Sequence, residues 1–353
     1  MVNPSNTPAK ISSGGTLRFY NLLGFSKLYN FILWFITMGY LLGFTLARLE
    51  YLSFNGRFCN ASSNGVTGAA PGECYYYLQN PFRTGIMLHL FTILPAAFLV
   101  VFQFTPAVRH AAILFHRING YLIITLSLIS SAGVLIIAKH AFGGDMATRT
   151  WSGALVTSTT IAYVMAYINI KLLQIDQHRA WMMRAWAYFS TIITIRLIMF
   201  ISANIISTMN GWYVTRPCAQ IGSIFGPHHT VAVYPECQAY FNGTNPQQVA
   251  IVVASMSNGN PISIAASLGV SFGSAGWLAF WIHAVLVEVY LRLTPIESER
   301  LRQVSYERQL ARRSKRPGYA GLVAERLGDS KPFVPDGNTN HMGHEVVAMD
   351  SLP

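Results

Sequence analysis

Charged side chains are scarce in this sequence. They make up 11% of the 353 residues, and 52% of the residues are hydrophobic, whereas soluble domains average about 25% charged residues. The mean hydropathy is +0.35. A single soluble domain of this length would show neither feature, so the composition predicts a protein with several membrane spans.

The short motifs of several enzyme classes are also missing. The sequence has no nucleotide-binding loop, no zinc-ligand spacing and no GxSxG nucleophile motif. Its Gly-Gly pairs at 14–15 and 143–144 are too generic to indicate phosphate binding. Because we find neither an internal repeat nor a soluble catalytic domain, any chemistry is expected within the membrane region.

Six apolar runs approach the ~20 residues that cross a bilayer as a helix. The sequence therefore predicts an all-α polytopic helix bundle with six transmembrane helices, forming a membrane domain over residues 29–291. The predicted spans are 29–49, 85–104, 119–140, 151–173, 185–207 and 264–291.

Basic residues favour a cytosolic location for both termini. The polar segment 1–28 carries Lys10, Arg18 and Lys27 and shows no cleavable signal peptide. The connections after the second and fourth spans are basic too. The tail 292–353 opens with a charged stretch, 297–316, that reads as a helix, and its polar end is expected to be disordered. We interpret its basic cluster as an anchor on anionic lipid rather than a nucleic-acid site.

The same orientation places the loops 50–84 and 208–263 in the lumen. All cysteines and both glycosylation sequons fall in these loops, which agrees with an oxidising compartment and suggests the endoplasmic reticulum. Locality favours two bridges, although the sequence alone leaves three pairings open. The residues concerned are Cys59 with Cys74, Cys218 with Cys237, and the sequon asparagines Asn60 and Asn242.

Arg196 lies near the middle of the apolar run 185–207. A guanidinium at the bilayer centre costs from roughly 2.5 to more than 10 kcal/mol. We therefore expect Arg196 to face a polar interior, where it either serves a function or joins two helices through carbonyl and hydroxyl groups.

Two motifs mark the predicted cytosolic face of the core region 85–207. One opens the third span and one opens the fifth, where His178, Trp181 and Met182 share a helical face. Asp176 could equally act as a helix cap, and the histidines could simply bond loop carbonyls. The motif residues are His116, Arg117 and Gly120, followed by Asp176, His178, Trp181 and Arg184.

Other polar and aromatic residues are candidates for chemistry. At the lumenal end, Asp145 near His140 and His89 could act as an acid or base whose pKa is shifted by partial burial. These residues could equally be ordinary polar residues at helix ends. Aromatic stripes usually pack or anchor helices, but they could also line a pocket that stabilises a carbocation. The stripes contain Tyr163 and Tyr167 on the fourth span, and Trp277 and Trp281 with Glu288 on the sixth.

Two other classes of protein are alternatives to an enzyme that needs no cofactor. A b-type cytochrome would use haem b between His89 and His140 and between His116 and His178. However, His116 and His140 are 24 residues apart, roughly 36 Å of helix, which exceeds the ~30 Å hydrocarbon core. A transporter could use Arg196 for an anionic substrate, but inverted halves and broken helix pairs are not visible.

The two motifs with Arg196 twelve residues after Arg184 resemble a family of multi-spanning proteins catalogued as a domain of unknown function. Its fungal branch includes membrane-bound terpene cyclases of ascochlorin, ascofuranone and macrophorin type. The likeness covers about residues 85–207 and carries over no catalytic residue.

The resemblance implies a non-oxidative cyclase without metal or redox cofactor. Its substrate would be lipophilic, a prenylated aromatic or epoxycyclohexenone with a sesquiterpenyl chain, and its partners would be membrane lipid and other pathway enzymes rather than nucleic acid. A desolvated carboxylic acid would start the reaction. We favour Asp145 for this role over Glu288 and Asp176, with Arg196 orienting the substrate's polar group or holding a carboxylate in place.

Overall fold

The computed structural model describes residues 19–335 except 61–67, 210, 322, 329 and 332. The fold is all-α and polytopic, as predicted, with one two-stranded sheet in the described part. Among the described residues, six helical segments are long and apolar enough to cross a membrane. They comprise α2 (Leu28–Arg48, extended by a 3-10 turn to Leu52), α4 (Phe82–Gln103), α6 (Ile113–Ile137), α7 (Met146–Lys171), α8 with α9 (Ile175–Phe189 and Thr191–Met209) and α13 (Pro261–Leu293).

Two span starts differ most from the sequence-based expectation. Helix α6 begins at Ile113 rather than 119, so its motif lies inside the helix. The fifth span begins at Ile175 rather than 185, and its 35 residues exceed what a bilayer requires. Both motifs are polar, so hydropathy did not include them in the predicted spans. They are nevertheless helical, because contacts with other helices stabilise these turns.

The chain forms two compact units, which we describe separately. The described part of the first unit, 19–49 and 93–126, contains α1 (Phe19–Leu22), α2, α5 (Pro106–Ala111), the second half of α4 and the first half of α6. Inside it, Asn119 donates hydrogen bonds to the Leu99 carbonyl and to Gln103 Oε1. These bonds join α6 to α4 where a polar side chain would otherwise be buried without partners.

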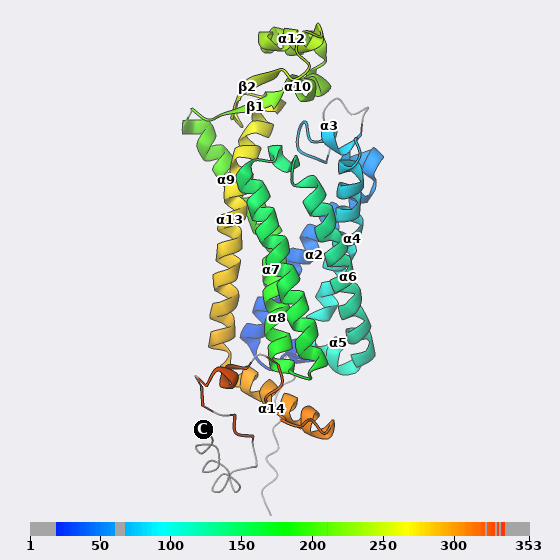
Figure 1. Ribbon diagram of the computed structural model, residues 1–353, viewed down its shortest axis with the longest axis vertical. Helices are drawn as coiled ribbons and strands as arrows, with labels where there is room; N and C mark the ends of the chain where they lie inside the picture. Colours follow the sequence, from blue (N-terminus) through cyan, green and yellow to red (C-terminus); the bar gives the residue numbers. More distant parts are fainter. Residues whose placement is uncertain are drawn as a thin grey trace, which may run out of the picture. The chain divides into compact units, whose positions relative to one another are not determined.

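The second unit, 50–92 and 127–335 as described, is built on α7, α8, α9 and α13, which pack side by side (Figure 1). Small residues of α13 allow close packing, since an added Cβ at Gly276 would lie 2.5 Å from the Trp151 ring. His283 of α13 donates from Nδ1 to the Ala187 carbonyl and accepts from Thr194 at Nε2. It thereby joins α13 to both sides of the α8–α9 break.

The two ends of this unit differ (Figure 1). At one end, which we call the disulfide end, β1 (Tyr213–Pro217) pairs antiparallel with β2 (Val249–Val253). With α10 (Cys218–Phe225), α11 (Pro227–Val233) and α12 (Gln238–Phe241), these strands form a cap, residues 211–254. The opposite end, the tail end, carries α14 (Pro295–Ala311), which matches the predicted charged helix but ends earlier. The polar segment from 336 onwards lies outside the described residues.

Candidate functional site

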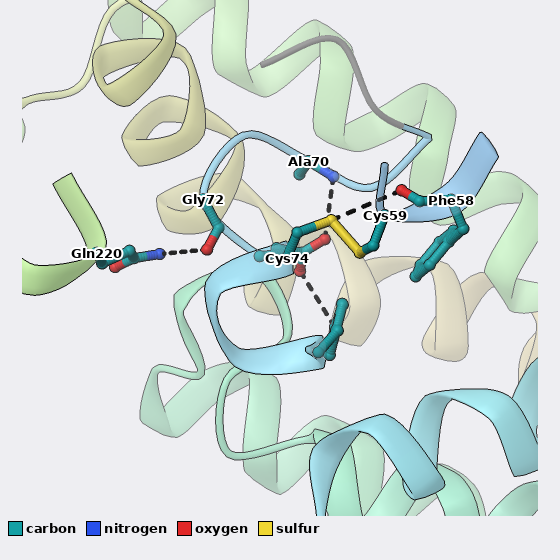
Figure 2. The surroundings of a disulfide bond; sticks show 8 residues. Phe58, Cys59, Ala70, Gly72, Cys74 and Gln220 are labelled. Carbon is teal, nitrogen blue, oxygen red and sulfur yellow. Dashed lines mark hydrogen bonds between the residues drawn. A yellow bond between two sulfur atoms is a disulfide. The ribbon is translucent and has the colours of Figure 1, made fainter. Parts of the chain in front are cut away.

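Both predicted disulfides are present, and the first one positions a carboxylate. Cys59 is bonded to Cys74, and Cys218 to Cys237. The Cys59–Cys74 bond closes the loop just before α3 (Cys74–Tyr77), and Glu73 is the residue that precedes this helix. Figure 2 shows the loop, with Gln220 of the cap donating a hydrogen bond to the Gly72 carbonyl at 3.1 Å. The bridge and the cap contact therefore fix the backbone around Glu73.

Glu73 is a buried carboxylate with several hydrogen-bond donors. Its side chain is 7% exposed. Its Oε1 accepts the Phe142 N–H at 2.7 Å, and its Oε2 accepts the Ala70 N–H at 3.1 Å. The Tyr77 hydroxyl donates to Oε1 at 3.4 Å. These donors satisfy the carboxylate while holding it in one orientation.

Burial dominates the proton affinity of this group. It raises the pKa of Glu73 above its usual range, although the backbone donors and the charge of Arg196 act in the opposite direction. Burial also raises the pKa of Tyr77 well above its usual value, and the nearby Glu73 adds to this shift. A desolvated carboxyl with a raised pKa is the kind of group that can donate a proton near neutral pH.

A group of aromatic rings with a guanidinium beside it lies next to the Phe142 backbone that binds Glu73. Phe142 and Phe272 stack with ring centroids 4.1 Å apart, and Trp151 meets Phe272 edge to face. The Arg196 guanidinium carbon lies 4.9 Å from the Phe142 centroid and 5.8 Å from that of Phe272. The faces of these rings thus already attract a positive charge.

Arg196 is carried by α9, within the fifth candidate span. Its neighbour Phe142 belongs to the connection between α6 and α7. Arg196 is therefore close to the connection that holds the Glu73 carboxylate, and its charge acts on that carboxylate.

The cap supplies the other wall of the site. Arg216 of β1 and Gln220 of α10 line a cavity of about 10 Å³ together with Glu73, Phe142 and Gly143, which is room for about one water molecule. Arg216 Nε and Gln220 Oε1 are buried and have no hydrogen-bond partner within the described part of the protein. Both atoms can therefore bind a polar group that enters the cavity.

Asp145, the acid that the sequence favoured, is exposed and caps α7. It accepts the Thr148 N–H at 2.7 Å. His140 stacks on Tyr76 with centroids 3.8 Å apart, and burial with nearby Lys139 and Arg149 lowers its pKa to about 4. His89 shares a hydrogen bond with Ser130 across 2.8 Å. Of this predicted cluster, the structure places Asp145 in an ordinary capping role.

The second motif joins helices at the tail end. His178 donates from Nδ1 to the Ala166 carbonyl, and Asp176 accepts from Ser305 of α14 instead of capping α8. Arg184 forms a two-pronged ion pair with Glu288 at 2.6 and 3.0 Å, and its guanidinium covers the Trp181 ring. These contacts connect α7, α8, α13 and α14, so Glu288 is at the opposite end of the unit from Glu73.

The first motif lies in the first unit. His116 and Gln103 have ring and amide nitrogens 3.4 Å apart. An added Cβ at Gly120 would lie 3.0 Å from Gln103 Nε2, so the absence of a side chain at Gly120 leaves room for the Gln103 amide. Arg117 is exposed.

The predicted pocket aromatics are spread over different surroundings. Tyr163 is 1% exposed and packs near Trp186 and Phe189. Tyr167 and Trp281 are exposed. Trp277 hydrogen-bonds Thr150 at 3.4 Å. The structure therefore does not bring them together, and the aromatic rings around Phe142 are other residues.

Sequence reasoning missed Glu73, Phe142, Arg216 and Gln220. The sequence did contain one signal for Glu73. It directly precedes Cys74, and a disulfide at Cys74 restricts the backbone position of the neighbouring residue. Of the sequon residues, Asn242 is exposed, whereas Ser62, which completes the Asn60 sequon, lies outside the described residues.

Comparisons with known proteins agree with a membrane protein. Residues 86–219 match the family described as predicted membrane protein (DUF2306). "Ava biosynthesis cluster protein G" of Aspergillus versicolor is 23% identical over 317 residues, covering 76% of this chain and 90% of that protein. No solved structure matches significantly. Residues 86–219 are thus similar to this family of predicted membrane proteins, which confirms the resemblance found in the sequence, and the six apolar helices among the described residues agree with a multi-pass membrane protein.

Proposed function

We propose that this chain is an integral-membrane terpene cyclase of fungal secondary metabolism. It would cyclise a prenylated, sesquiterpenyl aromatic or epoxycyclohexenone by proton donation, without oxidation. The single observation that carries the proposal is the buried Glu73 carboxyl, whose pKa is raised and which lies beside aromatic rings that already attract a cation. Glu73 replaces Asp145 as the acid that we favour.

The reaction starts when the Glu73 carboxyl gives its proton to a terminal alkene or epoxide of the substrate. The carboxylate that this step leaves attracts the developing carbocation, and the chain closes onto it. The product carbocation then loses a proton from carbon, and the Glu73 carboxylate takes it up. Between these steps the N–H groups of Phe142 and Ala70 stabilise the carboxylate. Atoms balance without a metal or redox cofactor.

The cap would bind the substrate's polar group and control entry. Arg216 Nε can donate to an oxygen of the substrate, and Gln220 Oε1 can accept from a hydroxyl. Since the cavity holds about 10 Å³, a sesquiterpenyl chain can enter only after the cap moves. The bond from Gln220 to Gly72 is one contact that must break during this movement.

The relative from Aspergillus versicolor supports the biosynthetic setting, since its name assigns that protein to a biosynthesis cluster. We infer a similar setting here, with the protein in the endoplasmic reticulum, glycosylated in its lumenal loops and associated with other enzymes of the pathway.

Membranes from cells that express the chain test this function. Given a farnesylated aromatic substrate or its epoxide, they should return a product of unchanged mass without added cofactor. For an alkene substrate in D₂O, the product should gain one deuterium on carbon, because the initiating proton comes from an exchangeable acid. Glu73→Gln should abolish the product, whereas Asp145→Asn, an exposed acid at the same end, should retain it.

Two outcomes would contradict the proposal. Normal turnover by Glu73→Gln would refute the assignment of the acid. A Soret band near 410–430 nm, which is typical of haem proteins, together with no conversion of these substrates would favour the cytochrome with haem b instead.

A further inference from the structure

A second cavity lies at the tail end of the second unit. It has a volume of about 350 Å³ and is lined by Lys171, Leu172, Leu173, Gln309, Arg312, Ser314 and Ala320. Helix α7 ends at Lys171 and α8 begins at Ile175. The cavity is therefore located where one membrane-spanning helix ends and the next begins, and its size is within the range of small-molecule sites.

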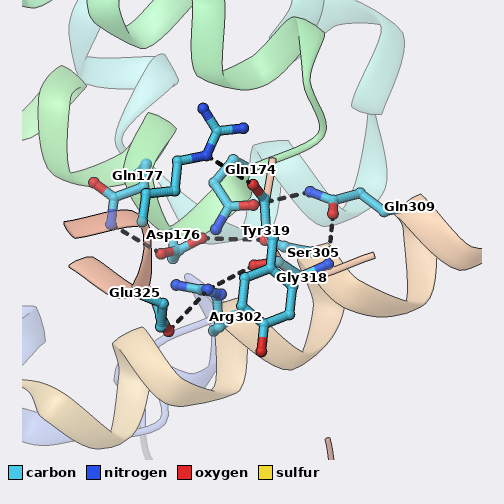
Figure 3. Close-up of polar contacts among 10 residues, drawn as sticks. Gln174, Asp176, Gln177, Arg302, Ser305, Gln309, Gly318, Tyr319 and Glu325 are labelled. Carbon is cyan, nitrogen blue, oxygen red and sulfur yellow. Dashed lines mark hydrogen bonds and ion pairs between the residues drawn. The ribbon is translucent and has the colours of Figure 1, made fainter. Parts of the chain in front are cut away.

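Buried hydrogen bonds hold the segment that forms one wall of this cavity. Gln309 is 1% exposed, and its amide donates to the Leu172 carbonyl and to Gln174 Oε1. Its Oε1 accepts the Gly318 N–H at 2.7 Å. Arg302 bonds the Gly318 carbonyl and pairs with Glu325 at 3.2 Å (Figure 3). The chain after α14 is thus folded back over the helix, which places Arg312, Ser314 and Ala320 in the cavity wall.

The backbone at the cavity is strained. Among the described residues, three that are not glycine have a positive φ, and Leu173 (φ 58) and Arg313 (φ 56) are two of them. Leu173 lines the cavity, and Arg313 lies between two lining residues. Such conformations cost of order 1–3 kcal/mol each and concentrate at ligand-binding sites. The third, Phe142, belongs to the Glu73 site.

The chemistry of the wall favours an anion attached to hydrocarbon. The described lining residues include two cations, Lys171 and Arg312, and no acid. Ser314 and Gln309 add polar groups, and Arg313, Lys315 and Arg316 raise the positive potential nearby. Leu172 and Leu173 give the cavity an apolar side that continues from the end of α7.

We propose that this cavity binds the phosphate headgroup of an anionic membrane phospholipid. Lys171 and Arg312 contact the phosphate, Ser314 donates a hydrogen bond to it, and an acyl chain lies along the leucines. Basic pockets at the ends of membrane helices bind phosphorylated headgroups in this way. The site is independent of the cyclase activity, and it is more selective than general attraction to a basic tail.

Lipid binding to the purified full-length protein tests the proposal. Native mass spectrometry in detergent would compare phosphatidylserine, phosphatidylinositol 4-phosphate and phosphatidylcholine with inorganic phosphate. We expect saturable binding of the anionic lipids, with phosphatidylcholine and inorganic phosphate bound at least about tenfold more weakly. The double variant Lys171→Gln/Arg312→Gln should lose this preference.

Matched variants separate the cavity from the basic tail. Arg300→Gln/Arg308→Gln removes the same charge from exposed positions of α14 outside the lining, and it should bind lipid as the wild type does. Ala320→Leu fills the cavity without changing charge and should weaken binding. Equal losses in the two double variants, or inorganic phosphate binding as tightly as lipid, would overturn the proposal. Unchanged melting in phosphatidylcholine would verify that each variant is folded.

Discussion

The Glu73 carboxylate and the Phe142 backbone are joined by a 2.7 Å hydrogen bond between two connections that are 69 residues apart in the sequence. Phe142 makes this bond from a left-handed conformation, φ 50. The same residue presents its ring to Arg196. One strained residue thus orients the carboxylate and binds the guanidinium beside it, and this strain is of order 1–3 kcal/mol.

The pH dependence of stability should reveal the raised pKa of Glu73. Burial raises this pKa above the value of 4.5 in an unfolded chain. A carboxyl with a higher pKa in the folded state stabilises the protein fully below pH 4.5 and loses that contribution as the pH rises through the folded-state pKa. We therefore expect the Tm of the wild type to fall relative to Glu73→Gln as the pH rises above 4.5. Thermal unfolding in detergent over a pH series measures this, and a constant difference would contradict it.

Asp145 should contribute to stability rather than to turnover. It caps α7 through the Thr148 N–H, and removal of such a cap costs about 1 kcal/mol. Asp145→Ala should lower the free energy of unfolding by this amount, whereas Asp145→Asn should preserve most of it. Product formed per folded molecule should be unchanged in both variants, and its loss in Asp145→Asn would restore Asp145 as a candidate acid.

Gly143 should be intolerant of a side chain. Its φ is +90, and an added Cβ would collide with the Arg216 guanidinium. Gly143→Ala should destabilise the protein by about 1–3 kcal/mol and reduce turnover by displacing Arg216.

Gly153 of α7 provides the control. A Cβ added there would meet no atom within 4 Å, so Gly153→Ala should keep activity and increase the free energy of unfolding by up to about 1 kcal/mol. Melting curves and product yields of Gly143→Ala and Gly153→Ala, each compared with the wild type, test this prediction.

The Arg184–Glu288 pair should be structural. Its side chains are 20% and 44% exposed, so we expect a coupling energy of at most about 1 kcal/mol in a double-mutant cycle. Glu288→Gln should retain turnover, because the carboxylate is engaged by Arg184 at the tail end. Loss of product at unchanged stability would instead support Glu288 as a catalytic group.

The sequence allowed the membrane helices and the disulfides to be predicted because both depend on local properties. A run of ~20 apolar residues has few alternatives to a spanning helix. Cys59 and Cys74 are 15 residues apart in one loop, which favours their pairing. Hydropathy could not locate the start of α8, because Asp176, His178 and Arg184 are polar and their partners come from other helices.

The candidate site depended on contacts between distant segments. By itself the sequence determined an all-α membrane protein with six spans and cysteine-bearing loops, since length and hydrophobicity are sufficient for that. Only the tertiary structure decided that Glu73 is buried while Asp145 is exposed, and that Arg196 lies against Phe142. The physical reason is that the proton affinity of a carboxyl depends on desolvation and on donors around it, and these donors come from residues 70, 77 and 142, with Arg196 nearby.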